Sequence, residues 1–233
     1  HTLFGRYEYA NLESPPQFDG VNVLTANLPH KGDRAQSLVL GDTYLIGAAT
    51  VSSFRATLLR TADAREKQDY NITYTDLGVK DVYLPPGFSK MIQVNVAGGF
   101  LVTPNMAVPG FTNSTAFQFA EDLSRVWGAH QVGFGANFLH TKMNLQAVTR
   151  VPGVMTFSAN NTGMGLGDFM TGRAASFDQS NVTVYYFRQN FLASYLQDTW
   201  KASSRLTLNG GIRWEPSQSP WEKYGHVPHI SQA

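Results

Sequence analysis

The chain has 233 residues, enough to bury a core as one all-β domain or as two domains. It is 42% hydrophobic, 12% aromatic and only 15% charged, a composition that argues against a disordered protein. The net charge of +1, from dispersed Lys and Arg, gives no indication of nucleic-acid binding, and the absence of Cys excludes a disulfide framework and thiolate metal sites.

The first expected element is a strand over residues 2–12, and the chain opens directly into it. Neither a signal peptide nor an initiating Met is visible, so the sequence is expected to be a mature product or a fragment. No run of about 18 apolar residues occurs, so no transmembrane helix is expected. A membrane barrel built from strands would escape that test, because alternate strand residues face a polar lumen.

Three hairpins with short turns follow along the chain. They join 36–45 to 51–61, 116–127 to 131–141, and 191–200 to 206–215. The last strand alternates strictly between apolar and polar positions over about ten residues, the length of a tilted bilayer-spanning strand. Its apolar positions are Leu206, Leu208, Gly210, Ile212 and Trp214, and its polar positions are Thr207, Asn209, Gly211, Arg213 and Glu215.

Long segments rich in Gly, Pro, Asn and Ser separate the hairpins, at about 13–35, 62–114, 142–187 and 216–233. If strands alternate in direction, all short turns lie at one end of the sheet and all long loops at the other. That asymmetry is typical of outer-membrane barrels, with short periplasmic turns and long extracellular loops. Seven expected strands are an odd number, whereas bacterial single-chain barrels have an even number. The predicted fold class is therefore all-β, an antiparallel transmembrane β-barrel arc in which residues 1–233 are part of one barrel domain.

The hairpins resemble those of TonB-dependent outer-membrane receptors, in particular the Oar-like group with a carboxypeptidase-regulatory-like domain. Thr115 to Gly135, TAFQFAEDLSRVWGAHQVGFG, resembles the segment F-Q-F-x-D-x-L-x-x-x-x-G-x-H-x-x-x-x-G of these receptors. Tyr195 to Glu215, YLQDTWKASSRLTLNGGIRWE, is similar to their Y-x-Q-D-x-W-x-x-x-x-x-L-T-L-N-x-G-x-R-Y-E hairpin, with Trp214 replacing the usual Tyr. SLVLGDTY at 37–44, VSSFR at 51–55 and PWEKYG at 220–225 extend the resemblance over most of the chain.

The resemblance implies a 22-stranded barrel with a plug, energised through the TonB system in a bacterial outer membrane. Neither a plug nor a TonB box is visible in these residues. The expected partners are outer-membrane lipid, the receptor's own plug domain and the TonB system. A small-molecule, saccharide or peptide ligand is also expected, and nucleic acid is not.

Signatures of catalysis are weak, and no catalytic, cofactor-binding or metal-binding residue is expected. The Gly-rich stretch from Gly165 to Gly172 lacks the Lys-Ser/Thr ending of a phosphate loop, and predicts a loop or a short helix. No Gly-x-Ser-x-Gly nucleophile elbow occurs.

Binding residues are more plausible, because aromatic rings beside amides suit sugars, peptides or chelates. The loop candidates are Tyr83, Phe88, Phe100, Phe111, Asn160, Asn161, Phe169 and Phe177, although such aromatics can equally pack the loops together. Residues expected to face the lumen or the plug are Asn137, Asn209, Arg213 and Glu215. Residues expected in a membrane-interface belt are Trp127, Trp200 and Trp214.

Two other functions fit the pattern: a soluble all-β carbohydrate-binding module, and a passive porin-like channel without a plug. The soluble protein must bury the apolar strand positions against a second sheet, whereas a barrel arc leaves them as an exposed band about 25 Å tall. The positions that decide between them are Leu206, Leu208, Ile212, Val132, Phe134 and Phe138.

Overall fold

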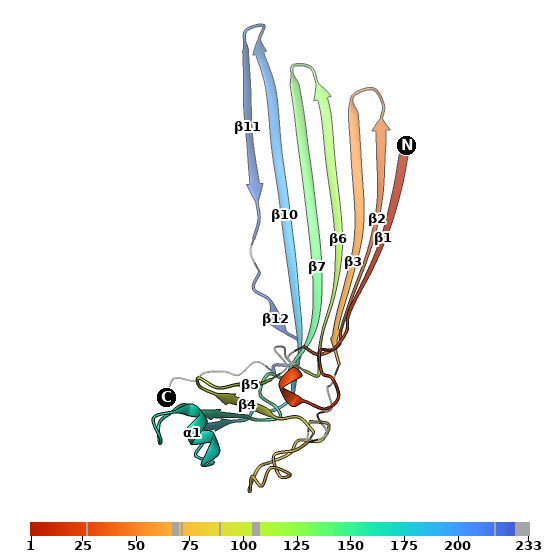
Figure 1. Ribbon diagram of the computed structural model, residues 1–233. Coiled ribbons are helices and arrows are strands. Elements are labelled where there is room, and N and C mark those ends of the chain that lie inside the picture. The colour runs from red at the N-terminus through yellow and green to blue at the C-terminus, as the bar shows by residue number, and fades with distance from the viewer. Residues whose placement is uncertain are drawn as a thin grey trace.

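The computed structural model describes residues 1–26, 28–66, 70, 72–88, 90–103, 108–216 and 218–226. These residues form two sheets. One has eight strands in the order β1-β2-β3-β6-β7-β10-β11, with β12 beside β10, and the other has four strands in the order β5-β4-β8-β9. Figure 1 shows the first sheet as a wall of long strands, with the second sheet gathered at the end away from the hairpin turns.

Seven long strands make up the wall, and every neighbouring pair is antiparallel. Together with the long connections at one end, this confirms the predicted fold class. The wall is open: β1 and β11 are its edges, and the described strands do not close into a barrel. The strands are β1 Thr2–Ser14, β2 Lys31–Ile46, β3 Thr50–Arg65, β6 Gly110–Trp127, β7 His130–Ala147, β10 Thr183–Ser203 and β11 Leu206–Trp214.

The strands are longer than the sequence predicts, so the expected loop bounds need correction. β10 has 21 residues and β6 and β7 have 18 each, against about 9–11 for crossing a bilayer. The expected loops at 13–35, 62–114 and 142–187 therefore contain strand ends. The ladder hydrogen bonds continue past the stretch in which apolar and polar residues alternate. Of the expected last loop, 216–233, residues 217 and 227–233 lie outside the described residues.

Successive hairpins project further along the strand direction, as the ribbon in Figure 1 shows. Thr50 at the start of β3 pairs with Arg125, and β6 runs two residues further, to Trp127. Trp200 of β10 pairs with His130, and β10 continues to Ser203. A steady stagger of this kind accompanies strands that are tilted relative to a barrel axis.

One face of the wall, here called the apolar face, carries a band of uncovered large apolar side chains. The band crosses β2, β3, β6, β7, β10 and β11, and among the described residues no second sheet packs on it. Ile212 is 72% exposed and Leu196 51% exposed. The deciding positions Leu206, Leu208, Phe134 and Phe138 are exposed as well, and Val132 is partly exposed. The band comprises Leu38, Leu40, Phe54, Leu58, Phe119, Leu123, Phe134, Phe138, Leu192, Leu196, Leu208 and Ile212.

The opposite face, here called the polar face, carries small and polar side chains in the half nearest the short turns. Residues that follow one another along a strand point to opposite faces. Leu123 therefore lies on the apolar face and Asp122 on the polar face. Glu121 interrupts the apolar band, where the Ser52 hydroxyl donates a hydrogen bond to its carboxylate at 2.5 Å.

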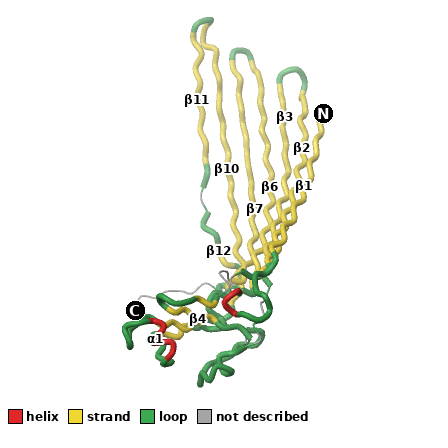
Figure 2. Tube along the Cα trace, in the orientation of Figure 1, coloured by secondary structure: helices red, strands yellow, loops and turns green. Residues whose placement is uncertain are grey.

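The long segments are not structureless, because they fold together beyond one end of the wall. We call this part the loop module, and it consists of the described residues of 15–30, 70–103 and 148–180. Its strands β4 (Gln93–Val96) and β8 (Val154–Phe157) pair in parallel, and Tyr74, Val94 and Phe157 belong to its buried core. Figure 2 shows that its regular elements are short and joined by loops. The other elements of the module are η1 Val23–Thr25, β5 Leu101–Val102, α1 Gly165–Met170 and β9 Ser176–Asp178. The short strand β12, Trp221–Glu222, belongs to the wall, where it pairs with β10.

The helix α1 occupies the Gly-rich stretch for which a loop or a short helix is predicted. A Cβ on Gly165 would lie 2.3 Å from the carbonyl oxygen of Ala97, so the absence of a side chain lets α1 begin against the end of β4. Among the described residues, no helix is both long enough and apolar enough to cross a membrane.

Candidate functional site

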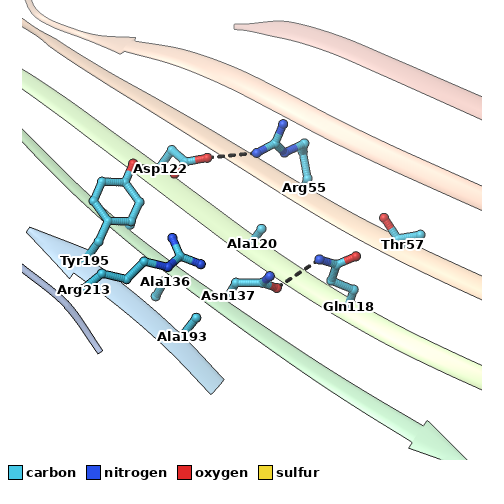
Figure 3. A pocket seen from close by; sticks show the side chains of 11 residues that line it. Arg55, Thr57, Gln118, Ala120, Asp122, Ala136, Asn137, Ala193, Tyr195 and Arg213 are labelled. Atoms are coloured by element: carbon cyan, nitrogen blue, oxygen red, sulfur yellow. Dashed lines mark hydrogen bonds and ion pairs between the residues drawn. The ribbon is translucent and has the colours of Figure 1, made fainter. Parts of the chain in front are cut away.

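The polar face is hollowed into a recess of about 380 Å³ across β3, β6, β7, β10 and β11. Figure 3 shows its side chains reaching from neighbouring strands into one shared space. The recess lies behind the apolar band, since its residues alternate with band residues along the same strands. Its lining includes Arg55, Thr57, Gln118, Ala120, Asp122, Gly135, Asn137, Ala193, Tyr195 and Arg213.

Small residues create the space for this recess. A Cβ on Gly135 would lie 2.1 Å from Cε1 of Tyr195, so the Tyr195 ring lies directly across the glycine. Ala120 and Ala193 flank Asn137 in register on the two adjacent strands. The wall is therefore thin at this place, and the larger polar side chains lie along its rim.

A carboxylate connects three strands in the recess. Asp122 accepts a hydrogen bond from Tyr195 Oη at 2.8 Å, and its other oxygen lies 2.9 Å from Nη2 of Arg55. The register brings them together, because Asp122 pairs with Gly135 and Gly135 pairs with Tyr195. The result is a fixed polar surface that offers a guanidinium, a phenol and a carboxylate to whatever lies against it.

The residues predicted to face the lumen all lie on or beside this polar face. Asn137 and Arg213 line the recess, and Asn137 accepts a hydrogen bond from Gln118 at 3.1 Å. Asn209 lies on the same face nearer the short turns, where it pairs with Thr199. Glu215 follows the end of β11 and forms an ion pair with Arg213.

The sequence reasoning did not select Arg55, Asp122 or Tyr195. Each is an ordinary residue in its own strand, and only the pairing of β3, β6, β7 and β10 brings them together. The alternation of side chains along β6 could have pointed to Asp122. Asp122 lies an even number of residues from the small residues of the polar face and so shares that face, whereas the neighbouring Glu121 points to the opposite face.

Most aromatics proposed as ligand contacts pack within the loop module, and their role in ligand binding stays a prediction. Phe88 is buried with Val148 and Val151. Phe169 packs edge-on against Phe100, with ring centroids 5.0 Å apart, and it also packs against Phe157. These rings therefore hold the module together.

Phe111 does not belong to a loop, which corrects the expectation from the sequence. It lies in β6, where it pairs with Ala64 and Gln146, because that strand begins at Gly110. Phe177 is exposed at the module surface and packs edge-on against Tyr74.

The remaining candidates are one aromatic residue and two amides, and some are exposed while one forms internal hydrogen bonds. Tyr83 and Asn160 are exposed on the module surface. Asn161 is used internally, since its backbone and side-chain N–H groups donate to Asp168. Thr162 donates to the same carboxylate through its backbone N–H and its hydroxyl, each at 2.7 Å. Asp168 is fully buried, and although burial raises its pKa, the hydrogen bonds from Thr162 and Asn161 lower it below the usual value.

The three tryptophans predicted to form an interfacial belt share the apolar face. Trp127 and Trp200 both pair with His130 beside the short turns, and the His130 ring stacks on Trp200 at 5.5 Å. Trp214 lies at the other end of β11, where it pairs with Ser194. All three are exposed, as side chains at a lipid–water boundary would be, and the belt itself stays a prediction.

Comparison with known proteins identifies the class of protein. A family model described as an outer membrane beta barrel domain matches residues 1–233. The chain therefore belongs to the outer membrane β-barrel domain family, and its place is the bacterial outer membrane. No curated protein and no solved structure matched the chain. The uncovered apolar band is thus the surface that contacts lipid, and the polar face is the lumen side of the wall.

Proposed function

We propose that the chain supplies part of the barrel wall and the ligand-capturing loops of a TonB-dependent receptor, which takes up a ligand with energy delivered through TonB. Support comes first from the resemblance of the hairpins to those receptors. In this proposal the chain binds and guides a ligand and performs no catalysis.

The observation that carries the proposal is the polar recess at bilayer depth. Leu123 and Leu196 point into lipid, while Asp122 and Tyr195, their neighbours in the chain, form the hydrogen-bonded recess on the other side. Charged groups held at membrane depth almost always face water or protein, and Glu121 on the lipid side is an exception that accepts a hydrogen bond from Ser52. A recess lined by fixed donors and acceptors is a surface on which a plug domain can dock.

The two open edges support a larger barrel. Within the part of the chain that the structure describes, β1 and β11 each have one unpaired side, so their backbone N–H and C=O groups lack strand partners there. Unpaired backbone groups cannot remain exposed to hydrocarbon. We infer that further strands continue the wall at both edges, and that the enclosed lumen is wide enough for a plug.

The loop module supplies the capturing surface in this proposal. It lies at the long-loop end, which is the extracellular end of outer-membrane barrels. Its buried aromatics make it a rigid rim, and Tyr83 and Asn160 offer an exposed ring and an exposed amide for a saccharide, peptide or other small ligand.

The proposal can be tested on the natural protein, purified from its outer membrane and inserted into planar lipid bilayers in KCl solution. A plugged receptor is expected to show no steady conductance and to retain the periplasmic part of TonB from the same bacterium on a column. Asp122→Leu removes the carboxylate of the recess and is expected to loosen the plug, so that stepwise conductance appears. Glu121→Gln, one residue away on the lipid side, is the matched control and is expected to remain closed.

Open channels in the unaltered protein, together with no retention of TonB, would contradict the proposal and favour the passive channel. Equal conductance in both variants would show that Asp122 in the recess does not hold a plug in place.

A further inference from the structure

The apolar face carries a row of basic side chains beyond the apolar band, towards the loop module, and on β7 and β10 His140 and Asn190 lie between the band and the row. Along β3 the last band residue is Leu58, and the next residue on that face is Arg60. Thr115, Lys142 and Arg188 continue the row on β6, β7 and β10. We call Arg60, Lys142 and Arg188 the basic row.

The register places these residues side by side. Arg60 pairs with Thr115, Thr115 with Lys142, and Lys142 with Arg188. Four adjacent strands at about 4.8 Å spacing put Arg60 and Arg188 roughly 14 Å apart at their backbones. Lys142 and Arg188 lie directly opposite each other, and like charges in that position destabilise a sheet unless an anion lies between them.

No carboxylate of the described chain neutralises the basic row. Arg60 and Lys142 are exposed, and Nζ of Lys142 lies 5.4 Å from the ring centroid of Phe117. Arg188 donates to Asn144 Oδ1 at 3.1 Å and to the carbonyl oxygen of Phe187 at 2.7 Å, both neutral acceptors. At the long-loop ends of β1 and β3, Glu13 and Glu66 both pair with His30 instead.

On the polar face at the same end of the wall, by contrast, basic side chains lie beside carboxylates. There Lys31 lies 2.6 Å from Asp33 and 3.2 Å from Asp63, and Arg65 lies 3.0 Å from Asp63. At this end of the wall the lumen-side cations Lys31 and Arg65 are thus matched by carboxylates within the chain, whereas the three cations of the basic row are not. The missing anion is therefore expected from outside the protein, on the lipid side.

We propose that the basic row binds the phosphate groups of lipopolysaccharide in the outer leaflet. The row lies within two positions of the end of the apolar band on the same face of each strand. That is the region of lipid head groups, where Arg and Lys bind phosphate through charge-assisted hydrogen bonds. The choice of outer leaflet rests on the proposed orientation, with the long loops outside. The binding itself requires neither a plug nor TonB.

The test uses the natural protein, purified from its outer membrane into non-ionic micelles, with bisphosphorylated lipid A as the probe and dephosphorylated lipid A beside it. Wild-type protein is expected to bind the phosphorylated lipid at least tenfold more tightly. Combining Arg60→Gln, Lys142→Gln and Arg188→Gln is expected to abolish that preference. Because Arg188 also lies beside β12, the double variant Arg60→Gln with Lys142→Gln is measured as well and is expected to lose most of it.

The matched control removes the same charge at the other end of the wall, by Arg125→Gln, Lys201→Gln and Arg205→Gln, and should keep the preference. Heat-modifiable gel mobility establishes that each variant is folded. Equal binding of both lipids by the wild type, or equal loss in the control, would overturn the proposal. Phosphatidylglycerol micelles that bind as tightly as lipid A, with the same dependence on the basic row, would instead assign the row to phospholipid.

Discussion

Leu196→Arg is expected to lower the equilibrium constant for insertion of the protein into lipid vesicles by roughly 30-fold or more. Leu196 lies within the apolar band, half exposed and uncovered by any part of the described chain. A cation on the lipid face of a barrel costs about 2–4 kcal/mol at the bilayer midplane. The measurement is the folded fraction of refolded protein, read from heat-modifiable gel mobility over a range of urea concentrations.

The control is the next residue, Gln197→Arg, which points to the polar face and is exposed there. It introduces the same side chain at the same depth, and it should insert nearly as well as wild type because its guanidinium faces water. In a soluble protein both positions would be surface sites, and both substitutions would be almost neutral. Equal behaviour of the two variants would therefore contradict the membrane assignment.

Tyr74→Phe is expected to loosen the loop module while leaving the wall intact. The Tyr74 hydroxyl accepts the backbone N–H of Gln93 at 2.9 Å, and it lies 2.8 Å from the Gln93 carbonyl oxygen and 2.7 Å from that of Gly153. It thereby joins β4 to the segment before β8, and its burial raises the pKa of Tyr74 to about 12. Removing the hydroxyl leaves buried backbone groups unpaired, at a cost of about 1–3 kcal/mol.

Hydrogen exchange provides the measurement for this variant. Amides in β4 and β8 should exchange roughly 5- to 150-fold faster, while amides in β7 and β10 should be unchanged. Tyr83→Phe is the matched control, because that side chain is 66% exposed. Unchanged exchange in β4 would show that the Tyr74 hydroxyl does not hold the module together.

The wall could be predicted from the sequence because its signal is local. Alternation from Leu206 to Trp214 fixes both the strand and its faces, and the short turns fix the partner strands. The far ends of the strands could not be predicted, because the alternation weakens there. The run Val184–Tyr185–Tyr186–Phe187 places aromatic side chains on both faces, so no period of two is visible, although all four residues lie in β10.

The loop module could not be predicted, because its signal is not local. β4 has four residues, and it pairs in parallel with β8, about 60 residues further along the chain. The sequence shows aromatic residues at Phe100 and Phe169, but it does not show that their rings pack against each other. The same limit applies to the recess, where Arg55, Asp122 and Tyr195 meet only through the pairing of four strands.

The central claim is that the apolar face of the wall contacts lipid and the polar face contacts water. The chain has no Cys, so a single Cys introduced at each position from 194 to 199 gives a unique attachment site for a nitroxide. In lipid vesicles, labels at 194, 196 and 198 should be accessible to dissolved oxygen, and labels at 195, 197 and 199 to a water-soluble nickel complex. Uniform access of the nickel complex to all six positions would contradict the account.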